Sequence, residues 1–347
     1  MPGIIPIVFM STKIPNVIFG TSCLGNLYQV MDENIKQQLV EQCFEHMGRP
    51  MVFDSAGKYG AGLALQSLGE SLKKAGVDPK DVIISNKLGW VHTPLTTPEP
   101  TFEPGVWKGL KNDAVQRISY DGIIECYHQG NELLGDYNSA LVSVHDPDEY
   151  LAAATDEEDE ARRYADILEA YRALFDLKQQ GLVESVGIGA KNWRIIERIA
   201  KDVKLDWAMV ANSMTIHSHP KELIAFMQQL EAQNTAIINS AVFNGGFLTG
   251  SDFYNYRELD PVADKALYDW RDQFYSICAE FSIKPAEAAV AFAQKIPGVK
   301  SIALSTTKPQ NVATNVKMAK AALPNAFWER LAVEGLIDED VLGYLVE

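Results

Sequence analysis

The chain has 347 residues, 47% of them hydrophobic, so it can bury a large core as two average domains or as one large α/β barrel. Its formal net charge of −15 argues against nucleic acid or an anionic membrane as the main partner, because both attract basic surfaces. No stretch approaches the roughly 20 apolar residues that span a bilayer. The four cysteines are widely spaced, at Cys23, Cys43, Cys126 and Cys278. Such spacing is typical of reduced thiols, and we expect a soluble, cytoplasmic protein.

The first predicted elements are a small hairpin over residues 4–20, which leads into a strand near residue 18, and a helix over about 34–47. The apolar run 51–54 then predicts a short strand that ends in Asp54. Tyr59 follows in a glycine-rich turn, and an amphipathic helix comes next. On this segment alone, two interpretations are equally good: Asp54 caps the helix with Tyr59 packed beneath it, or the two side chains form a functional pair.

Two further apolar runs end in polar residues, at 82–87 and 140–145. Between them, the proline-rich segment 89–112 carries Trp90 and Trp107 and predicts a long ordered loop. Long loops in compact domains are usually lids or binding loops. A helix is predicted over about 119–134, and a capping-box pattern at 155–158 opens another helix that runs to about residue 180.

The second half of the chain repeats the alternation of strand and helix, apart from a second long loop over 245–261. Eight strands are predicted, centred near residues 18, 52, 84, 143, 186, 209, 238 and 302. Strict alternation requires a parallel sheet, and eight units fit a closed (β/α)₈ TIM barrel formed by residues 1–347 as a single domain. A doubly wound open sheet is the alternative, but no G-x-G-x-x-G follows the first strand.

In such a barrel, the carboxyl ends of the strands face the active site. The second, third and fourth strands end in Asp54, Lys87 and His145, and Tyr59 lies just beyond Asp54. A phenol with a pKa near ~10 exchanges protons poorly at neutral pH, but a neighbouring ammonium favours the phenolate. A carboxylate would hold that ammonium in place, and the imidazole would orient a substrate oxygen. The pattern therefore predicts a proton-transfer site for an alcohol or a carbonyl, which needs a hydride partner.

The other histidines favour packing roles. His128 falls inside a predicted helix, which indicates a surface or packing residue. His217 and His219 lie close together, but the sequence offers no third ligand at a suitable spacing. We therefore predict a loop there and no metal site.

Four motifs resemble those of the aldo-keto reductase family, and they occur in the family's order. They are F-D-S-A-x-x-Y-G at 53–60, I-S-N-K at 84–87, V-S-V-H-D-P-D at 142–148 and Q-G-L-V-E-S-V-G-I-G at 180–189. The resemblance implies a (β/α)₈ barrel that binds an extended nicotinamide dinucleotide without a Rossmann fold. It also implies a catalytic tetrad of Asp54, Tyr59, Lys87 and His145, with Tyr59 as the general acid or base.

The resemblance further implies cofactor contacts at several strand ends. Asn192 matches the asparagine that would hold the nicotinamide amide. The other positions lie in two segments: Phe243, Asn244, Gly246 and Leu248 along the pyrophosphate, and Ser305, Thr306, Thr307, Asn311 and Asn315 at the adenosine phosphate. The aromatic residue that stacks on the nicotinamide has no clear match, and Phe243 is the candidate.

The adenosine segment departs from the NADP-preferring pattern. Ser305 and Asn311 stand where such members carry Lys and Arg, although Lys308 lies nearby. Without bidentate recognition of a 2′-phosphate by Arg, the sequence points to NAD and leaves NADP open. The helix after Tyr59 also departs from the usual Ser-Glu, with Ala64 and Leu65 instead.

Segments at 24–28 and 243–248 resemble the sugar dehydrogenases of the family. These act on D-threo-aldoses such as L-fucose and on L-galactose, and a pyridoxal 4-dehydrogenase is a close relative. The resemblance implies oxidation of an anomeric hydroxyl to a lactone, in a pocket walled by Tyr28, Trp90 and Trp107. Loop packing is an equally good interpretation of the two tryptophans.

Two other functions remain open on the sequence: an NADPH-dependent reductase of aldehydes or ketones, and a cofactor-binding regulatory subunit without catalysis. The expected partner is a small sugar or aldehyde, without nucleic acid or membrane. The oligomeric state is left open, and a homo-oligomer is compatible with the sequence.

Overall fold

The computed structural model describes residues 14–255 and 257–346. In the described chain, eight parallel strands close into a barrel in the order β1-β12-β9-β8-β7-β6-β3-β2. The barrel strands are β1 (Val17–Gly20), β2 (Met51–Ala56), β3 (Val82–Leu88), β6 (Ser139–His145), β7 (Ser185–Ala190), β8 (Trp207–Ala211), β9 (Ala236–Ser240) and β12 (Val299–Leu304). The predicted (β/α)₈ barrel is therefore confirmed.

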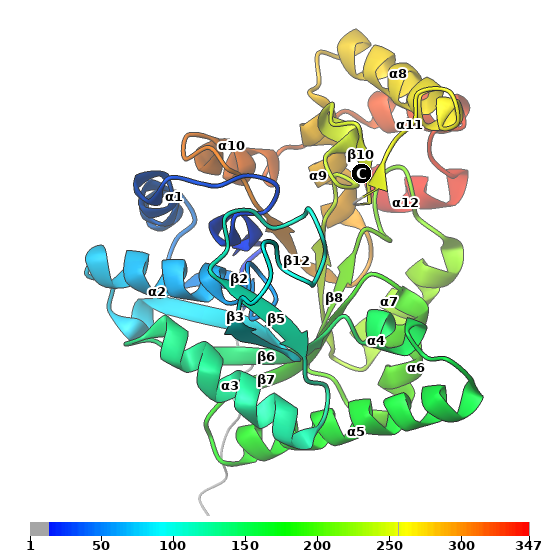
Figure 1. Ribbon diagram of the computed structural model, residues 1–347. Helices are drawn as coiled ribbons and strands as arrows, with labels where there is room; N and C mark the ends of the chain where they lie inside the picture. The colour runs from blue at the N-terminus through cyan, green and yellow to red at the C-terminus, as the bar shows by residue number, and fades with distance from the viewer. Residues whose placement is uncertain (1–13, 256, 347) are drawn as a thin grey trace, which may run out of the picture.

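Helices surround the barrel on its outer side (Figure 1). They are α1 (Glu33–His46), α2 (Leu63–Lys74), α3 (Tyr120–Leu134), α5 (Glu157–Gln179), α6 (Trp193–Asp202), α7 (Lys221–Ala232), α9 (Pro285–Lys295) and α10 (Asn311–Met318). Four further helices are α4 (Pro147–Ala152), α8 (Lys265–Glu280), α11 (Asn325–Val333) and α12 (Leu342–Leu345). Figure 1 shows α8, α11 and α12 gathered at one corner of the molecule. Among the described residues, no helix combines the length and the apolar character needed to cross a membrane.

The interior of the barrel is closed at the end where the strands begin. Trp207, the first residue of β8, is fully buried there beside Ile18 and Val52. Gly187 on the neighbouring strand β7 makes room for it, because a β-carbon at this position would lie 2.2 Å from the indole ring. Side chains therefore fill the barrel at the end where the strands begin, and the barrel is open at the end where the strands finish.

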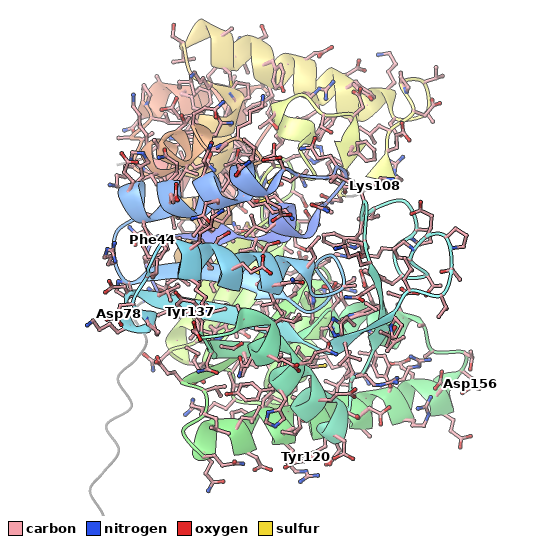
Figure 2. All side chains as sticks on the ribbon, turned by 60° about the vertical axis from the view of Figure 1, so that its left-hand side comes forward. Phe44, Asp78, Lys108, Tyr120, Tyr137 and Asp156 are labelled. Atoms are coloured by element: carbon pink, nitrogen blue, oxygen red, sulfur yellow. The ribbon has the colours of Figure 1, made fainter. Side chains whose placement is uncertain are left out.

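The predicted long loop over 89–112 is shorter than expected. Strands β4 (Trp90–Pro94) and β5 (Asn112–Gln116) pair antiparallel, so the loop connects the two strands of a hairpin and covers residues 95–111. The side chain of Gln129 on α3 fixes the hairpin, since it binds both the backbone N–H and the carbonyl of His92, at 2.7 and 3.2 Å. The strand pair was not predicted because the prolines of the connecting segment are typical of irregular structure. Only the residues at the base of the hairpin need to pair. In Figure 2, Lys108 on this hairpin lies at the opposite end of the molecule from Asp78, which precedes β3.

Other boundaries moved by a few residues. Strand β2 continues to Ala56, so Asp54 lies inside the strand and not at its end. The N-cap of α5 is Asp156 and not Thr155, and its carboxylate accepts the N–H of Asp159 at 2.8 Å. The second predicted loop contains a short strand pair, β10 (Phe253–Tyr254) and β11 (Arg257–Glu258). The hairpin predicted over 4–20 lies mostly outside the described residues, and its last part is β1.

Candidate active site

A buried ion pair occupies the open end of the barrel. The Nζ atom of Lys87 on β3 lies 2.6 Å from Oδ2 of Asp54 on β2, and it also donates to the carbonyl of Ser55 at 3.1 Å. The hydroxyl of Ser85 donates to the other carboxylate oxygen of Asp54 at 3.1 Å. Both charged side chains are almost fully buried, so each depends on the other for compensation of its charge. This pairing holds a charged ammonium at a fixed point of the cavity.

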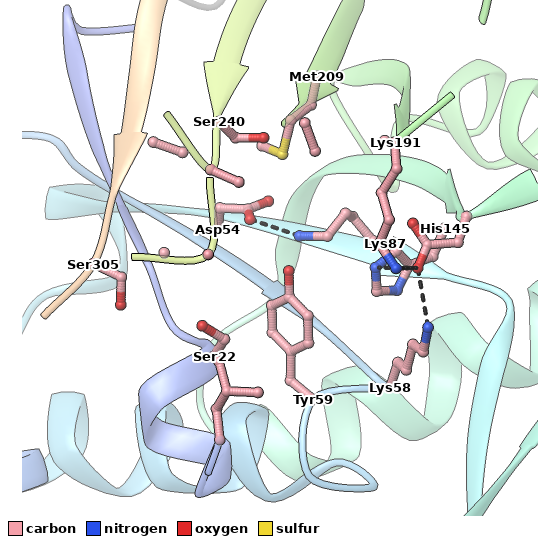
Figure 3. Close-up of a pocket in the computed structure, with 18 of the residues that line it drawn as sticks. Ser22, Asp54, Lys58, Tyr59, Lys87, His145, Lys191, Met209, Ser240 and Ser305 are labelled. Carbon is pink, nitrogen blue, oxygen red and sulfur yellow. Dashed lines mark hydrogen bonds and ion pairs between the residues drawn. The ribbon is translucent and has the colours of Figure 1, made fainter. Parts of the chain in front are cut away.

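Tyr59 lies against this ion pair. It stands in the turn between β2 and α2, and the Nζ atom of Lys87 lies 4.7 Å from the centre of its ring. Figure 3 shows the phenol hydroxyl directed toward the Asp54–Lys87 pair. The turn is seated on the loop after β1 at Gly60, where φ is +62° and a β-carbon would lie 2.3 Å from the carbonyl oxygen of Gly25. The phenol is thus held beside an ammonium, which favours its ionised form.

His145 at the end of β6 completes the predicted tetrad. Its ring meets the ring of Tyr59 edge to face, with 5.5 Å between the ring centres. Burial, together with the charges of Lys87 and Lys58, holds the pKa of His145 well below its usual range, so the imidazole is neutral at neutral pH.

A neutral imidazole carries one N–H, and the surroundings indicate where it is. The Nε2 atom of His145 lies 3.6 Å from Oδ2 of Asp146, whereas its Nδ1 atom is buried without a hydrogen-bond partner in the described chain. A lone pair facing a carboxylate is repelled, so we assign the proton to Nε2. His145 is therefore a hydrogen-bond donor at the cavity.

The four tetrad side chains line one cavity of about 340 Å³. Tyr28 and Trp107 also line it, and Trp107 packs against Tyr59 with 5.7 Å between the ring centres. The backbone N–H of Tyr28 donates to the carbonyl of Val106 at 2.8 Å, which joins the loop after β1 to the hairpin. Trp90 does not belong to the lining. It packs behind the wall, with its ring 5.2 Å from the Nζ atom of Lys58.

Three of the predicted cofactor residues, Phe243, Gly246 and Ser305, line the same cavity. Asn244 is buried and its amide donates to Oδ1 of Asn255 at 3.0 Å, while Leu248 packs in the hydrophobic core. The other predicted positions follow Ser305 away from the cavity and into the start of α10: Thr306, Thr307, Asn311 and Asn315. The predicted set thus extends from the cavity toward the outside of the barrel.

The segment after β9 is shaped to admit a phosphate group. Asn244, Gly245 and Gly246 have positive φ angles of 50°, 72° and 95°. The two glycines line the cavity without side chains, so an anion can approach the backbone there. Ser22 and Ser305 add hydroxyl groups to the lining. This donor set fits the pyrophosphate of a dinucleotide.

Asn192 is not brought together with the tetrad. Its side chain is exposed and caps α6, where Oδ1 accepts the N–H of Arg194 at 3.1 Å. Its backbone N–H donates to Oδ2 of Asp148 at 2.8 Å. The preceding residue, Lys191, lines the cavity instead.

Sequence reasoning missed a charged network beside His145. Its members, Lys58, Glu103, Asp146, Glu149 and Lys191, are joined by ion pairs. A signal for two of them was present, because Lys58 directly precedes Tyr59 and Asp146 directly follows His145.

His128, His217 and His219 lie outside the cavity lining. His128 is exposed on α3. Nε2 of His219 accepts the backbone N–H of Asp338 at 3.1 Å, and Nδ1 of His217 lies 2.9 Å from the hydroxyl of Tyr254. Throughout residues 14–255 and 257–346, no group of three or more His, Cys, Asp or Glu side chains could hold a metal ion.

Comparison with known proteins agrees with this geometry. The chain is 26% identical over 332 residues to pyridoxal 4-dehydrogenase from Microbacterium luteolum, covering 92% of this chain and 93% of that protein. It is 26% identical over 343 residues to D-threo-aldose 1-dehydrogenase from a Pseudomonas species, covering 93% and 95%. An aldo-keto reductase from Bacillus halodurans, solved in its holo form, superposes with a TM-score of 0.63 at 19% identity, covering 93% and 92% of the two chains.

The family model for the aldo/keto reductase family matches residues 16–333. This match spans all eight barrel strands and the whole tetrad. The chain therefore belongs to the aldo/keto reductase family of oxidoreductases.

Proposed function

We propose that this protein is an NAD-dependent dehydrogenase that oxidises the anomeric hydroxyl of an aldose to the lactone. The observation that carries the proposal is the buried Asp54–Lys87 pair beside Tyr59, with a neutral His145 on the same cavity. The similarity to D-threo-aldose 1-dehydrogenase supports an aldose as the substrate.

The tetrad can take a proton from a sugar hydroxyl in the following way. The anomeric oxygen binds between Tyr59 and His145, and Nε2–H of His145 donates a hydrogen bond to it. The phenolate of Tyr59 accepts the hydroxyl proton, and the ammonium of Lys87 stabilises that phenolate beforehand. Asp54 keeps Lys87 charged and in place. When bound, the nicotinamide supplies the hydride acceptor for the carbon that bears this oxygen.

We also propose a preference for NAD over NADP. Members of this family use nicotinamide dinucleotides. The adenosine segment of this chain offers Ser305 and Asn311 where recognition of a 2′-phosphate needs Lys or Arg, and Lys308 on the same segment is exposed. We expect Asn311→Arg to raise kcat/KM for NADP about tenfold without a comparable gain for NAD, because a guanidinium binds phosphate with two hydrogen bonds. Equal kcat/KM values for NAD and NADP in the unaltered protein would contradict this preference.

Pyridoxal is a second candidate substrate. The similarity to pyridoxal 4-dehydrogenase is as high in identity as that to the aldose enzyme, and the aromatic residues Trp107 and Tyr28 line the cavity. The same tetrad would serve both substrates, so the choice between them rests on direct assay.

The deciding experiment follows the absorbance of reduced nicotinamide with L-fucose, D-arabinose, L-galactose and pyridoxal, each with NAD and with NADP. Turnover of an aldose with NAD that is lost in Tyr59→Phe supports the proposal. Turnover of pyridoxal alone selects the second candidate. Oxidation of NADPH by simple aldehydes, without turnover of any aldose, would replace the proposal by a carbonyl reductase. Tight binding of dinucleotide without turnover of any substrate would favour a regulatory subunit.

A further inference from the structure

The cavity wall beside His145 consists of paired charges. We call this set, formed by Glu103, Asp146 and Glu149 around Lys58 together with Lys191, the charged wall. The Nζ atom of Lys58 lies 2.8, 3.0 and 2.8 Å from the carboxylates of Glu103, Asp146 and Glu149. Lys191 is paired with Glu149 and lies 3.8 Å from Oδ2 of Asp146. In Figure 3, Lys58 and Lys191 approach the side of the cavity next to His145.

Lys58 organises this wall and is already fully engaged. Its ammonium has three hydrogens, and three carboxylates lie within hydrogen-bond distance. Burial lowers its pKa, but the charges of Asp146, Glu103 and Glu149 outweigh burial and hold the pKa above its usual range. Lys58 therefore remains charged and positions the carboxylates, two of which, those of Glu103 and Asp146, line the cavity.

Asp146 directly follows His145, and its Oδ2 atom lies 3.6 Å from Nε2 of that histidine. The backbone of Asp146 adopts a left-handed conformation, with φ of +48°, and its N–H donates to the carbonyl of Gly189 at 2.9 Å. The side chain lines the cavity, and its contacts with Lys58, Lys191 and Nε2 of His145 all involve Oδ2. Lone pairs of the carboxylate therefore remain for a ligand that donates a hydrogen bond.

The position of Asp146 indicates which substrate group it meets. In the proposed function, on which this inference rests, the reacting oxygen binds to Tyr59 and to Nε2 of His145. That Nε2 atom lies 3.6 Å from Oδ2 of Asp146. Oxygens on adjacent carbons of a sugar lie about as far apart as hydrogen-bonded oxygens do. A hydroxyl on the carbon next to the reacting carbon therefore falls within reach of this carboxylate.

We propose that Asp146 is a specificity-determining residue that accepts a hydrogen bond from the hydroxyl adjacent to the reacting carbon. The protein then selects substrates that carry a hydroxyl next to the reacting carbon, as both open-chain and cyclic aldoses do, over substrates without that hydroxyl. A carboxylate bound to a hydroxyl gives a short, charge-assisted hydrogen bond, whereas it repels a carboxylate or phosphate at the same place. A site built for a hydroxyl also rejects the analogue that lacks it, because its polar groups are left unpaired.

The test compares two aldehydes that differ only in this hydroxyl, lactaldehyde and propanal, both reduced with NADH. The measured quantity is the ratio of their kcat/KM values, because a general loss of activity or stability cancels in the ratio. We expect the unaltered protein to prefer lactaldehyde by roughly tenfold or more. Asp146→Asn should bring the ratio close to one. Asn tolerates a positive φ, so this change preserves the backbone.

Glu149→Gln is the matched control. Glu149 belongs to the same network and is also paired with Lys58 and Lys191, but it does not line the cavity. We expect this variant to keep the lactaldehyde preference. If Asp146→Asn does not fold, Asp146→Glu keeps the pair with Lys58 and moves the carboxylate by one methylene group, and it should also lower the ratio.

Four results would overturn the inference: no turnover of either aldehyde, no preference in the unaltered protein, an unchanged ratio in both Asp146 variants, or an equal fall in Glu149→Gln. The proposed function fails separately. Absence of aldose oxidation with an intact lactaldehyde preference would remove the aldose proposal and keep this inference. Aldose oxidation with an unchanged ratio in Asp146→Asn would keep the aldose proposal and remove the inference about Asp146.

Discussion

The two sides of the cavity are lined by different kinds of chemical group. On the side that we propose to be catalytic, β2, β3 and β6 carry the charged Asp54 and Lys87 and the neutral His145, each almost fully buried. On the nucleotide side, the segments after β9 and β12 offer glycine backbone and hydroxyls, at Gly246 and Ser305 among others. Proton transfer needs fixed charges, whereas a phosphate needs close approach to the backbone. In the proposed function, proton transfer and nucleotide binding therefore take place on different sides of one cavity.

The sharpest test of this division is Tyr59→Phe. This change removes one hydroxyl from the catalytic side and leaves the nucleotide side intact. We expect kcat to fall about 10³-fold, because the general base is lost, with an unchanged dissociation constant for NAD. Steady-state kinetics and titration of protein fluorescence with NADH measure the two quantities. A comparable loss of dinucleotide affinity would contradict the separation.

Lys87→Met tests whether the charges of the catalytic side depend on one another. It leaves Asp54 buried with Ser85 as a remaining donor. We expect the free energy of unfolding to fall by about 3–5 kcal/mol in urea denaturation, the usual result of breaking a buried ion pair.

Lys36→Met is the control for that experiment. Lys36 is equally buried, but its partner Glu33 is largely exposed to solvent. Water can replace the lost ammonium there, so we expect a loss of no more than about 1 kcal/mol. Equal losses in the two variants would show that burial of the lysine, and not the pairing, sets the effect.

Gly246→Ala tests the nucleotide side. With φ of +95°, alanine is strained here, and its β-carbon would lie 3.0 Å from that of Ser251. We expect KM for NAD to rise about tenfold, or about 1.4 kcal/mol, while kcat at saturation changes little. Gly250→Ala carries a similar strain, at φ of +102°, but lies outside the cavity lining. It should therefore lower stability alone, and an equal rise in its KM would point to general loosening of the loop.

The smallest expected effect concerns pH. The pKa of His145 is held well below that of the unfolded chain, near ~6.5, and burial also lowers the pKa values of His217 and His219. Below this pH the unfolded state binds more protons, so stability falls as pH falls. In His145→Gln, one histidine that takes up a proton on unfolding is absent. The free energy of unfolding of this variant should therefore depend on pH less steeply than that of the unaltered protein, by up to about 1.4 kcal/mol per pH unit. Parallel profiles between pH 7 and 5.5 would show that His145 takes no part.

The catalytic side was the easier one to predict from sequence. A charged residue at the end of an apolar run is a strong local signal, and the barrel topology brings Asp54, Lys87 and His145 to one rim. The nucleotide side gave weaker signals, because glycines and serines are common in any loop. Asn192 illustrates this limit, since its side chain caps α6 and does not line the cavity.

Features that depend on distant contacts could not be predicted. The β4–β5 hairpin was hidden because its anchor, Gln129, lies on the following helix. The charged wall joins residues from the loops after β2, β3, β6 and β7, and pairings such as Lys58 with Glu149 exist only in the folded chain. The position of Asp54 inside β2 was missed because Ser55 and Ala56 carry no strand signal of their own.

The β4–β5 hairpin has a further consequence for how this barrel changes over evolutionary time. Its base is closed by the hydrogen bond from the N–H of Arg117 to the carbonyl of Gly89, at 2.7 Å. Between these residues lie Glu103 and Trp107, which line the cavity. Replacement of residues 95–111 would thus alter the substrate pocket while β3 and α3 keep their paths. If the proposed function holds, substrate choice depends partly on this one segment, which can change without any change in Asp54, Tyr59, Lys87 or His145.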